Sequence, residues 1–595
     1  MSDVWIAGIA RGHNASVCLL KNGKIVFSIE EERLTRAKYD GGPYAAMMRI
    51  KEYTDKLDYL VIAHTQSLND TAGKVDFMGE DVYTGLARKL GLIDRKCDLR
   101  KHPQVLDLSH IHHKLHAACS FYRSGFESAV AVIVDGAGTF IPMKDAYGEP
   151  AIGWETESIF QCNYPNEFKT LYKHIGMRGP LSTMNIKDAP GTFYNEADSH
   201  EVVISDRAGI VKVYEAVTQY CGWQSIEAGK TMGLFPYGKP SERFPKLFDD
   251  SGDVKLSNRN FIIPTYPNGS VVNYNNHSFL NYHGNSENFD VTTLENRREL
   301  AYAVQTESQQ MVLDLIIKAS EMTGEKNVVV SGGYGLNCVA NYFYLTKLNE
   351  LGIKMYVEPI SNDAGTAIGA AMLVHYDMKD AERIDYTKDG LYLGFCYEHN
   401  LDDILTKYSV EVSDATYADV VQLLRNKNIV AMYQGRSENG PRALGNRSLL
   451  FDPTFRDGKE FVNLVKRREY FRPFAGSILK EHVHEWFDLR GMDETPYMMY
   501  AVNCQPGIEE KIPSIIHVDG TCRIQTVTEE QNYHYYNLIK EFYKETGVPI
   551  VFNTSFNLGG DPLVETIEDA IDTLTRSDIE YLYLPEYNKL VYIKN

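Results

Sequence analysis

The sequence contains no long apolar run and no cysteine spacing of the kind that binds zinc or marks a disulfide framework. No hydrophobic stretch approaches the ~20 residues that span a bilayer, so we expect no membrane segment. Residues 1–8 lack the basic start and apolar core of a signal peptide. The nine cysteines form no C-x-x-C pair, which predicts reduced thiols in a cytoplasmic protein.

Positive charge is also scarce. The chain has 61 Lys and Arg residues against 80 Asp and Glu residues, giving a formal charge of −19. Such a balance argues against a nucleic-acid-binding surface over the whole protein, although a local basic groove is compatible with it. No internal repeat or low-complexity tract is present, and 595 residues are enough for two or three domains.

Two histidines four residues apart, His112 and His116, stand in a run with helical periodicity. On a helix this spacing places both imidazoles on one face, which suits a divalent metal. An isolated pair of this kind is more often an ordinary surface or core pair. The expected strand at 128–134, however, ends in Asp135 followed by glycines, and a second such turn occurs at Asp363. These two carboxylates favour a metal site.

The N-terminus is expected to form strands at 4–9, 15–21 and 24–29, with a glycine turn at 11–14 and a hairpin at 22–23. This order is similar to the start of a ribonuclease H-like half in the actin, sugar-kinase and Hsp70 superfamily, whose first turn cradles phosphate through Gly12. The charged run that follows, residues 30–33, is expected to be a solvated helix start.

The middle of the chain gives a second set of expected elements. Segment 140–226 is predicted to hold an insertion with short strands and a helix at 208–220. Residues 227–238 are expected to form a glycine-punctuated loop with a buried Lys230, and residues 240–290 a polar surface excursion. We expect a helix at 297–322 and strands at 327–330 and 355–357.

A loop between the strand at 327–330 and the helix after it contains Gly332, Gly333 and Asn337. Paired glycines at such a point allow close approach to a nucleotide. The first ~380 residues therefore look like two ribonuclease H-like halves, with Asp135 and Asp363 pointing into one cleft.

A second α/β domain is predicted to follow, with a helix at 417–425 and a strand at 429–433. Its segments are otherwise apolar or turn-forming, yet they contain five basic residues: Arg442, Arg447, Lys466, Arg472 and Arg523. A separate salt bridge would explain any one of them. Five together favour a pocket for a phosphorylated, multiply anionic ligand.

Nine strings, in order along nearly the whole chain, resemble the NodU/CmcH family of O-carbamoyltransferases. They are GHNAS (12–16), HHKLHAA (112–118), VDGAG (134–138), SGGYGLNCVAN (331–341), SNDAGTAIGAA (361–371), GRSENGPRALGNRS (435–448), KRREYFRPFA (466–475), HVDGTCRIQTV (517–527) and VFNTSFN (551–557). GPRALGNRS together with KRREYFRP is highly specific, whereas GHNAS alone would be weak.

The resemblance implies an actin-like, threonylcarbamoyl-transferase-like domain at 1–390 and a YrdC-like α/β domain at 391–595. It implies that carbamoyl phosphate and ATP give carbamoyladenylate, and that the carbamoyl group then passes to an acceptor hydroxyl. Carried over by motif, Lys466, Arg472, Arg523 and Ser555 match the carbamoyl-phosphate and ATP site. The metal ligands match His112, His116, Asp135 and Asp363, with iron as the metal in the family, and His13 matches the residue taken to act as base.

The sequence departs from the family pattern in two ways, and the second, the unmatched regions, leaves the acceptor open. Phe235 stands where the family usually has alanine, and regions 65–105 and 140–200 match no shared motif. A sugar or polyol hydroxyl on a small molecule is the default acceptor, and a hydroxymethylated base in DNA is the alternative. The alternative depends on two groups of basic residues. The first comprises Arg88, Lys89, Arg95, Lys96, Arg100, Lys101 and His102. The second comprises Lys169, Lys173, His174 and Arg178 and is interleaved with the aromatic residues Tyr164, Phe168 and Tyr172.

Two other classes of function compete. A tRNA threonylcarbamoyl-transfer enzyme would share both domain types, but the arginine-rich motifs of the second domain favour carbamoyl phosphate. A non-catalytic nucleotide-binding module would not need His13 together with four metal ligands.

Overall fold

A computed structural model of the chain describes residues 3–66, 82–95, 102–144, 148–177, 201–205, 209–241, 247–248, 293–379, 381–397, 400–408 and 410–593. The chain divides into two compact units. The first comprises residues 1–12, 18–24 and 47–387, and the second comprises 13–17, 25–46 and 388–595. None of the helices among the described residues is long and apolar enough to cross a membrane.

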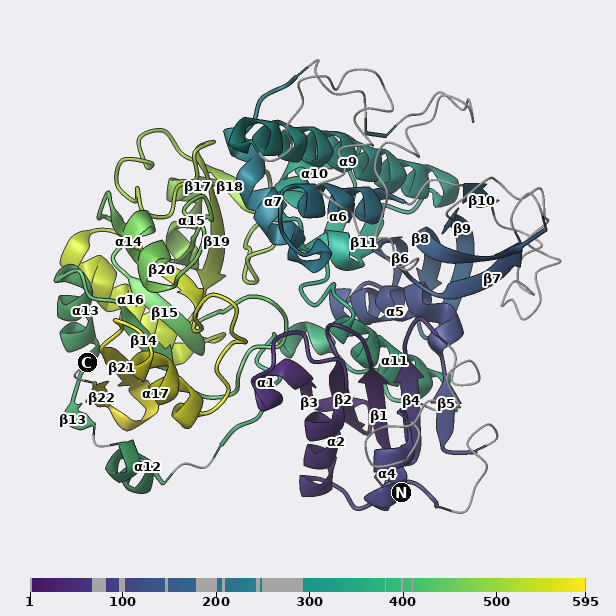
Figure 1. Cartoon of the computed structure of the whole chain (residues 1–595), viewed down its shortest axis with the longest axis horizontal. Coiled ribbons are helices and arrows are strands. Elements are labelled where there is room, and N and C mark those ends of the chain that lie inside the picture. The colour runs from purple at the N-terminus through teal and green to yellow at the C-terminus, as the bar shows by residue number, and fades with distance from the viewer. Residues whose placement is uncertain are drawn as a thin grey trace. The chain divides into compact units, whose positions relative to one another are not determined.

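The N-terminal sheet has five strands in the order β3-β2-β1-β4-β5. They are β1 (Trp5–Ala10), β2 (Ser16–Lys21), β3 (Lys24–Glu30), β4 (Tyr59–Ala63) and β5 (Val105–Asp107) (Figure 1). Strands β1, β4 and β5 run parallel to one another. Helix α11 (Ala364–Asp377) lies so close to β1 that a Cβ on Gly8 would be 2.0 Å from the carbonyl oxygen of Ala367. Only glycine permits this approach.

A second sheet in the first unit has the order β10-β9-β8-β6-β11-β12, and β7 pairs with β8. Its strands are β6 (Ser128–Val134), β7 (Phe140–Lys144), β8 (Pro150–Asn163), β9 (Glu167–Met177), β10 (Glu201–Ser205), β11 (Asn327–Ser331) and β12 (Lys354–Val357). The expectation of short strands in the insertion is wrong for β8 and β9, which have 14 and 11 residues. They pair with each other along most of their length, and this mutual pairing sustains them.

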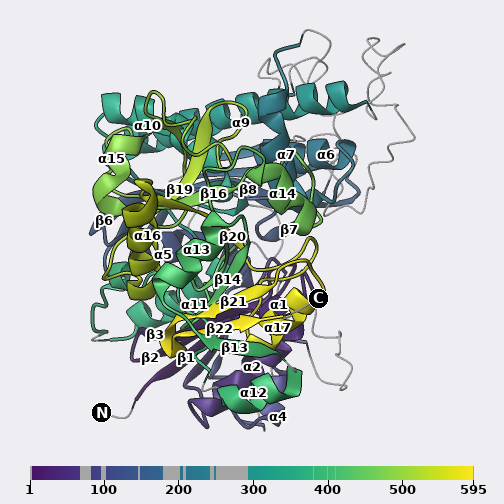
Figure 2. The ribbon, with the colours of Figure 1, turned by 90° about the vertical axis from the view of Figure 1, so that its left-hand side faces the viewer.

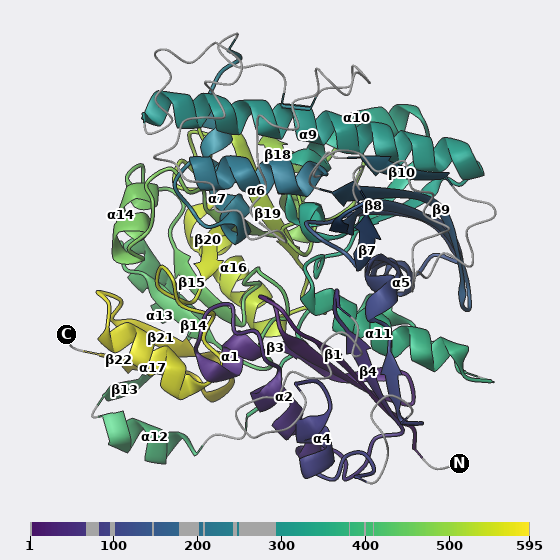
Figure 3. The same ribbon diagram turned by 45° about the vertical axis from the view of Figure 1, so that its right-hand side comes forward.

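Helices cover this second sheet. Those that pack against it are α5 (His112–Ser124), α6 (Ile210–Tyr220), α9 (Leu294–Thr323) and α10 (Cys338–Glu350), and α7 (Ala228–Leu234) packs on α6 and α9. The short α4 (Gly85–Lys89) precedes them in the chain. Figure 3 shows α6 and α7 beside the long α9. Residues 227–238 are therefore mostly helical, and the prediction of a loop there is wrong. Glu227 caps the start of the helical stretch by accepting the backbone N–H of Gln224 at 2.9 Å. The predicted excursion at 240–290 lies almost wholly outside the described residues.

The second unit is built on a ten-stranded sheet in the order β13-β22-β21-β14-β15-β20-β16-β19-β18-β17. Several of these strands, among them β13, β22, β21 and β14, can be followed in Figure 2. The strands of the sheet are β13 (Glu411–Asp414), β14 (Val430–Tyr433), β15 (Arg447–Phe451), β16 (Ala475–Leu479), β17 (Phe487–Asp488), β18 (Ala501–Cys504), β19 (Thr521–Val527), β20 (Ile550–Ser555), β21 (Tyr581–Leu584) and β22 (Lys589–Tyr592). Its helices are α12 (Leu401–Tyr408), α13 (Tyr417–Arg425), α14 (Gly458–Val465), α15 (Val483–Trp486), α16 (Tyr533–Thr546) and α17 (Ile567–Thr575). The fold class is thus mixed α/β with several sheets, while the actin-like and YrdC-like assignments stay predictions.

The charged run at residues 30–33 is buried, so the expectation of a solvated helix start is wrong. It leads into α1 (Glu31–Thr35) and, after a turn, α2 (Tyr44–Arg49). The Glu31 carboxylate accepts the backbone N–H groups of Ala45 and Ala46 at 2.6 and 2.9 Å. Arg33 donates to the carbonyl oxygen of Gly440 at 2.7 Å. These hydrogen bonds with backbone groups of the second unit offset part of the cost of burying the charges.

Candidate metal centre and anion-binding cluster

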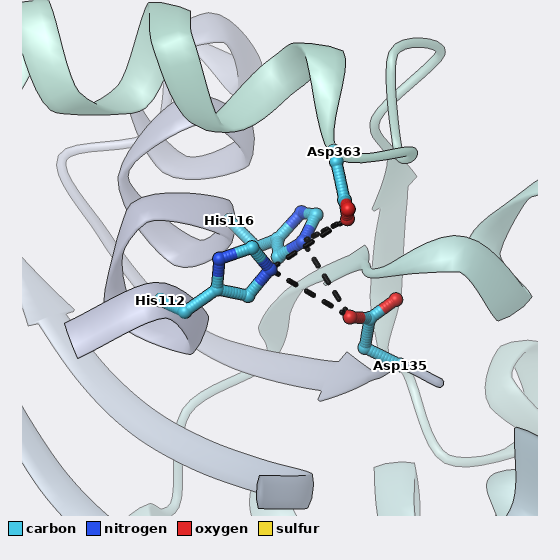
Figure 4. Close-up of side chains that lie close together, drawn as sticks. All are labelled: His112, His116, Asp135 and Asp363. Atoms are coloured by element: carbon cyan, nitrogen blue, oxygen red, sulfur yellow. Dashed lines mark ion pairs between the residues drawn. The ribbon is translucent and has the colours of Figure 1, made fainter. Parts of the chain in front are cut away.

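Four predicted metal ligands come together in the first unit (Figure 4). His112 and His116 stand one turn apart on α5, Asp135 follows the end of β6, and Asp363 precedes the first residue of α11. The four come from three separate segments of the chain. The parallel strands and α11 bring them to one point because strand ends meet at the same edge of a sheet.

The separations within this group suit a shared cation. His112 Nε2 lies 3.7 Å from Asp135 Oδ2 and 3.6 Å from Asp363 Oδ1. His116 Nε2 lies 4.0 Å and 3.7 Å from the same two oxygens. Two ligands that are each ~2.1 Å from one ion lie at most ~4.2 Å apart, so all four separations are compatible with one ion between them.

Burial and charge at this site favour a cation as well. Both ring nitrogens of each histidine are buried without a hydrogen-bond partner among the described residues. Burial opposes protonation of His112, but the nearby carboxylates of Asp135 and Asp363 outweigh it and raise its pKa to about 10. The pKa of Asp135 is held well below its usual range because the two histidines outweigh burial. A divalent ion would replace the proton that this arrangement otherwise retains.

The predicted glycine loop holds one ligand in place. The backbone N–H of Gly333 donates to Asp135 Oδ1 at 2.8 Å, which leaves Oδ2 toward the histidines. Gly332 has φ +87° and ψ 162°, and a Cβ there would lie 2.4 Å from the carbonyl oxygen of Val134. A Cβ on Gly12 would lie 3.8 Å from Asp363 Oδ2, so this turn also reaches the site.

Two other predicted nucleotide-binding residues have partners within the protein. Asn337 caps α10 through the N–H of Ala340 and donates to Gln305 Oε1 at 3.0 Å. Lys230 pairs with Glu227 at 2.8 Å. Their roles toward a nucleotide stay predictions.

The predicted carbamoyl-phosphate residues of the second unit surround Lys466. This lysine follows α14, is 2% exposed, and donates to the carbonyl oxygen of Ser555 and to that of Asn557 at 2.8 Å. The Ser555 hydroxyl donates to Asn557 Oδ1 at 2.6 Å. Burial, Arg468 and Arg472 lower the pKa of Lys466 well below its usual range.

Arg468 and Asn557 belong to this cluster but are missing from the residues predicted from the sequence. The Arg468 guanidinium stacks on Phe474, with 4.4 Å between its central carbon and the ring centroid. Burial, Arg472 and Arg523 lower the pKa of Arg468 well below its usual range. Arg468 lies two residues after Lys466 in KRREYFRP, so the motif could have indicated that Arg468 belongs to the cluster. The four cations that repel one another here, Lys466, Arg468, Arg472 and Arg523, form what we call the cationic cluster.

Arg447 is in a different environment. It is fully buried, and its guanidinium stacks 3.7 Å above the centroid of Tyr433. It donates to four backbone carbonyl groups, those of Gln434, Gly435, Asn446 and Glu565. The structure therefore gives Arg447 the role of holding loop backbone together. Arg442 is partly buried and His13 is exposed, and the ligand-binding and catalytic roles of both stay predictions.

Two family models match the chain. The carbamoyltransferase N-terminus matches residues 51–372, and the carbamoyltransferase C-terminus matches residues 421–590. The chain belongs to the carbamoyltransferase family. It is an enzyme that transfers carbamoyl groups, and the likeness to NodU/CmcH members seen in the sequence is confirmed.

Relatives of this carbamoyltransferase include two nodulation proteins. NolNO of Sinorhizobium fredii is 29% identical over 97% of this chain and 78% of its own length. NolO of Bradyrhizobium diazoefficiens is 30% identical over 79% of this chain and 77% of its own length. Among solved structures, HypF of T. kodakarensis is 12% identical, with a TM-score of 0.35 over 65% of this chain and 49% of HypF. A likeness that low supports no argument about this carbamoyltransferase.

Part of the basic and aromatic group suggested for DNA lies in the interior of the carbamoyltransferase, whereas Lys169 is exposed. Lys173 forms a buried ion pair with Glu155, and His174 pairs with Glu157 at 2.5 Å. Phe168 packs edge-on against Phe121, with ring centroids 5.7 Å apart. These side chains are not available to grip a phosphate backbone. Lys96, Arg100, Lys101 and Arg178 lie outside the described residues.

Proposed function

We propose that this carbamoyltransferase makes carbamoyladenylate at the cationic cluster and transfers its carbamoyl group to the hydroxyl of a small molecule at the four-ligand centre. The observation that supports the first half is the cationic cluster itself. Its four cations repel one another, and Glu469 is an acidic partner of Arg472, with 3.7 Å between the carboxylate and the guanidinium. Mutual repulsion of this kind is relieved when a multiply charged anion binds.

The activation step must give the carbamoyl group a better leaving group, because carbamoyl phosphate is a poor electrophile toward an alcohol. Water cleaves carbamoyl phosphate to carbamate and phosphate, and a carbamate oxygen then attacks the α-phosphorus of ATP with loss of pyrophosphate. The product is a mixed anhydride, carbamoyladenylate. In this scheme Lys466 and Arg472 bind the phosphate groups, and the half-buried Arg468 adds a fixed charge beside them.

The transfer step joins the acceptor oxygen to the carbamoyl carbon and breaks the bond between that carbon and the AMP oxygen. The hydroxyl proton goes to a base, for which His13 is our candidate because a neutral imidazole suits this role near pH 7. His112, His116, Asp135 and Asp363 would hold a divalent ion, which when bound neutralises phosphate charge. Gly333 keeps Asp135 oriented for this through its backbone N–H.

A small-molecule hydroxyl is the acceptor class we favour, because Lys173 and His174 are already paired with buried glutamates. The test is to incubate the enzyme with ATP and carbamoyl phosphate, with a panel of sugars and polyols in one arm and hydroxymethylated DNA in the other. Mass spectrometry then detects an added carbamoyl group. We expect product in the small-molecule arm. Product on the nucleoside of digested DNA would overturn the acceptor assignment, and loss of that signal as salt rises would identify phosphate contacts.

A further inference from the structure

His64 is close enough to the four-ligand centre for the charges of His112 and Asp363 to act on its imidazole, and the transfer scheme does not yet use it. It follows β4, which runs parallel to β1 with Ala63 beside Ala10. The residues after these two strands therefore emerge at the same edge of the sheet. On β1 they are Arg11 and Gly12, and the position of a Cβ on Gly12 is 3.8 Å from Asp363 Oδ2. His64 thus lies at the Asp363 side of the centre.

Hydrogen bonds fix the tautomer of His64. The backbone N–H of Gln66 lies 3.3 Å from Nδ1 and can only donate. Nδ1 must therefore be an acceptor, and the hydroxyl of the buried Tyr83, 3.0 Å away, donates to it as well. The proton of the neutral ring is then on Nε2. His64 therefore offers an N–H donor at Nε2. The lone pair of Nδ1 already accepts hydrogen bonds, so the ring does not accept a proton from the substrate.

The ring is also held neutral. Burial is the main cause, and it lowers the pKa of His64 to about 4. The side chain is nevertheless only partly covered. A neutral donor that is partly open at the edge of the centre is suited to bind an oxygen whose charge grows during reaction.

We propose that His64 Nε2–H donates a hydrogen bond to the carbonyl oxygen of the carbamoyl group as transfer proceeds. This inference rests on the proposed transfer function. When the acceptor oxygen attacks the carbamoyl carbon, the C=O electron pair moves onto that oxygen. The donor stabilises this charge until the carbonyl re-forms and the bond to AMP breaks. His64 is thus a catalytic donor, distinct from the proton-accepting His13, and Tyr83 is a positioning residue for it.

The kinetic test uses His64→Leu, which keeps apolar bulk but has no donor, and His64→Gln, whose amide can reach a similar point. Each is assayed for pyrophosphate release, metal content and carbamoyl transfer to the acceptor found in the panel. Loss of one oxyanion donor slows transfer by about 100- to 1000-fold, so we expect that loss in His64→Leu and partial recovery in His64→Gln. Pyrophosphate release and metal content should match wild type. Transfer by His64→Leu within twofold of wild type would overturn the proposal.

A spectroscopic test needs no acceptor and uses the wild-type enzyme and Tyr83→Phe. Histidine-labelled ¹⁵N spectra should show His64 as the Nε2–H tautomer, and its Nε2–H proton should move downfield when a sulfamoyl analogue of carbamoyladenylate binds. In Tyr83→Phe we expect a mixed tautomer signal. An Nδ1–H tautomer in the wild-type enzyme contradicts the inference. Absence of carbamoyl product from the wild-type enzyme in every acceptor arm instead counts against the transfer function, so the two failures are distinguishable.

Discussion

Gly333 donates its backbone N–H to Asp135 Oδ1 at 2.8 Å and so turns the other carboxylate oxygen toward His112 and His116. A loop predicted from the sequence to approach a nucleotide thus has a contact of its own with a candidate metal ligand. The geometry of the centre therefore depends on the backbone of the loop after β11 as well as on the four side chains.

Substituting the adjacent Gly332 by alanine should disturb this arrangement. Its φ of +87° with ψ of 162° is a conformation almost confined to glycine, and a Cβ would lie 2.4 Å from the carbonyl oxygen of Val134. We expect Gly332→Ala to lower the free energy of unfolding by about 2–3 kcal/mol and to weaken metal binding. The matched control is Gly352→Ala, which has φ +65° but no atom within 4 Å of a new Cβ. Equal losses of unfolding free energy in the two variants, measured by chemical denaturation, would show that the close contact with Val134 does not cause the loss.

Removal of a candidate ligand should remove the metal. His116→Ala leaves three of the four ligands, and we expect its bound metal, measured by elemental analysis after dialysis, to fall at least tenfold. His110→Ala is the control, because His110 is exposed at the start of the same helical stretch. A full complement of metal in His116→Ala would exclude this residue from the ligand set.

Arg468 should contribute as much to carbamoyladenylate formation as Lys466 and Arg472, which are predicted from the motif. Arg468→Ala removes a half-buried charge beside Lys466 and Arg472, and we expect carbamoyl-phosphate-dependent pyrophosphate release to fall by at least 100-fold. Lys427→Ala provides a control in the same unit, since Lys427 pairs with Asp457 at the surface. If Arg468→Ala released pyrophosphate at the control rate, the cluster would not include Arg468.

Glu31 should make the second unit sensitive to pH. Burial raises its pKa to about 7, while the N–H groups of Ala46 and Ala45 oppose the shift. A carboxyl whose folded pKa lies above its unfolded value of about 4.3 contributes stability at low pH and loses that contribution as pH rises toward 7. Glu31→Gln cannot ionise, so its stability relative to wild type should increase between pH 5 and pH 8. Thermal melts across that range measure the difference, and a constant difference would contradict the shift.

Much of the first unit could be predicted from local sequence. The helix at 297–322, the strand at 327–330 and the four candidate metal ligands follow from periodicity and strand-end carboxylates, and they appear in the structure. Those signals are local, since each depends on a few neighbouring residues and on ligand chemistry that the side chain itself carries.

Other features depend on distant partners that local patterns do not reveal. Glu31 and Arg33 look like a solvated charge run until Ala45, Ala46 and Gly440 supply backbone partners. Lys173 and His174 look like a basic surface until β8 places Glu155 and Glu157 beside them. Arg447 looks like a phosphate ligand, yet the loop carbonyls take its hydrogen bonds.

The most direct test of the account is to look for its intermediate. Wild-type enzyme is mixed with ATP and carbamoyl phosphate, without acceptor, and quenched samples are analysed for carbamoyladenylate by mass spectrometry and for pyrophosphate. We predict both products in equal amounts in the wild-type enzyme and neither in Lys466→Ala, which lacks the buried amine of the cationic cluster. Carbamoyl transfer that proceeds without ATP, or pyrophosphate release that does not need carbamoyl phosphate, would contradict the account.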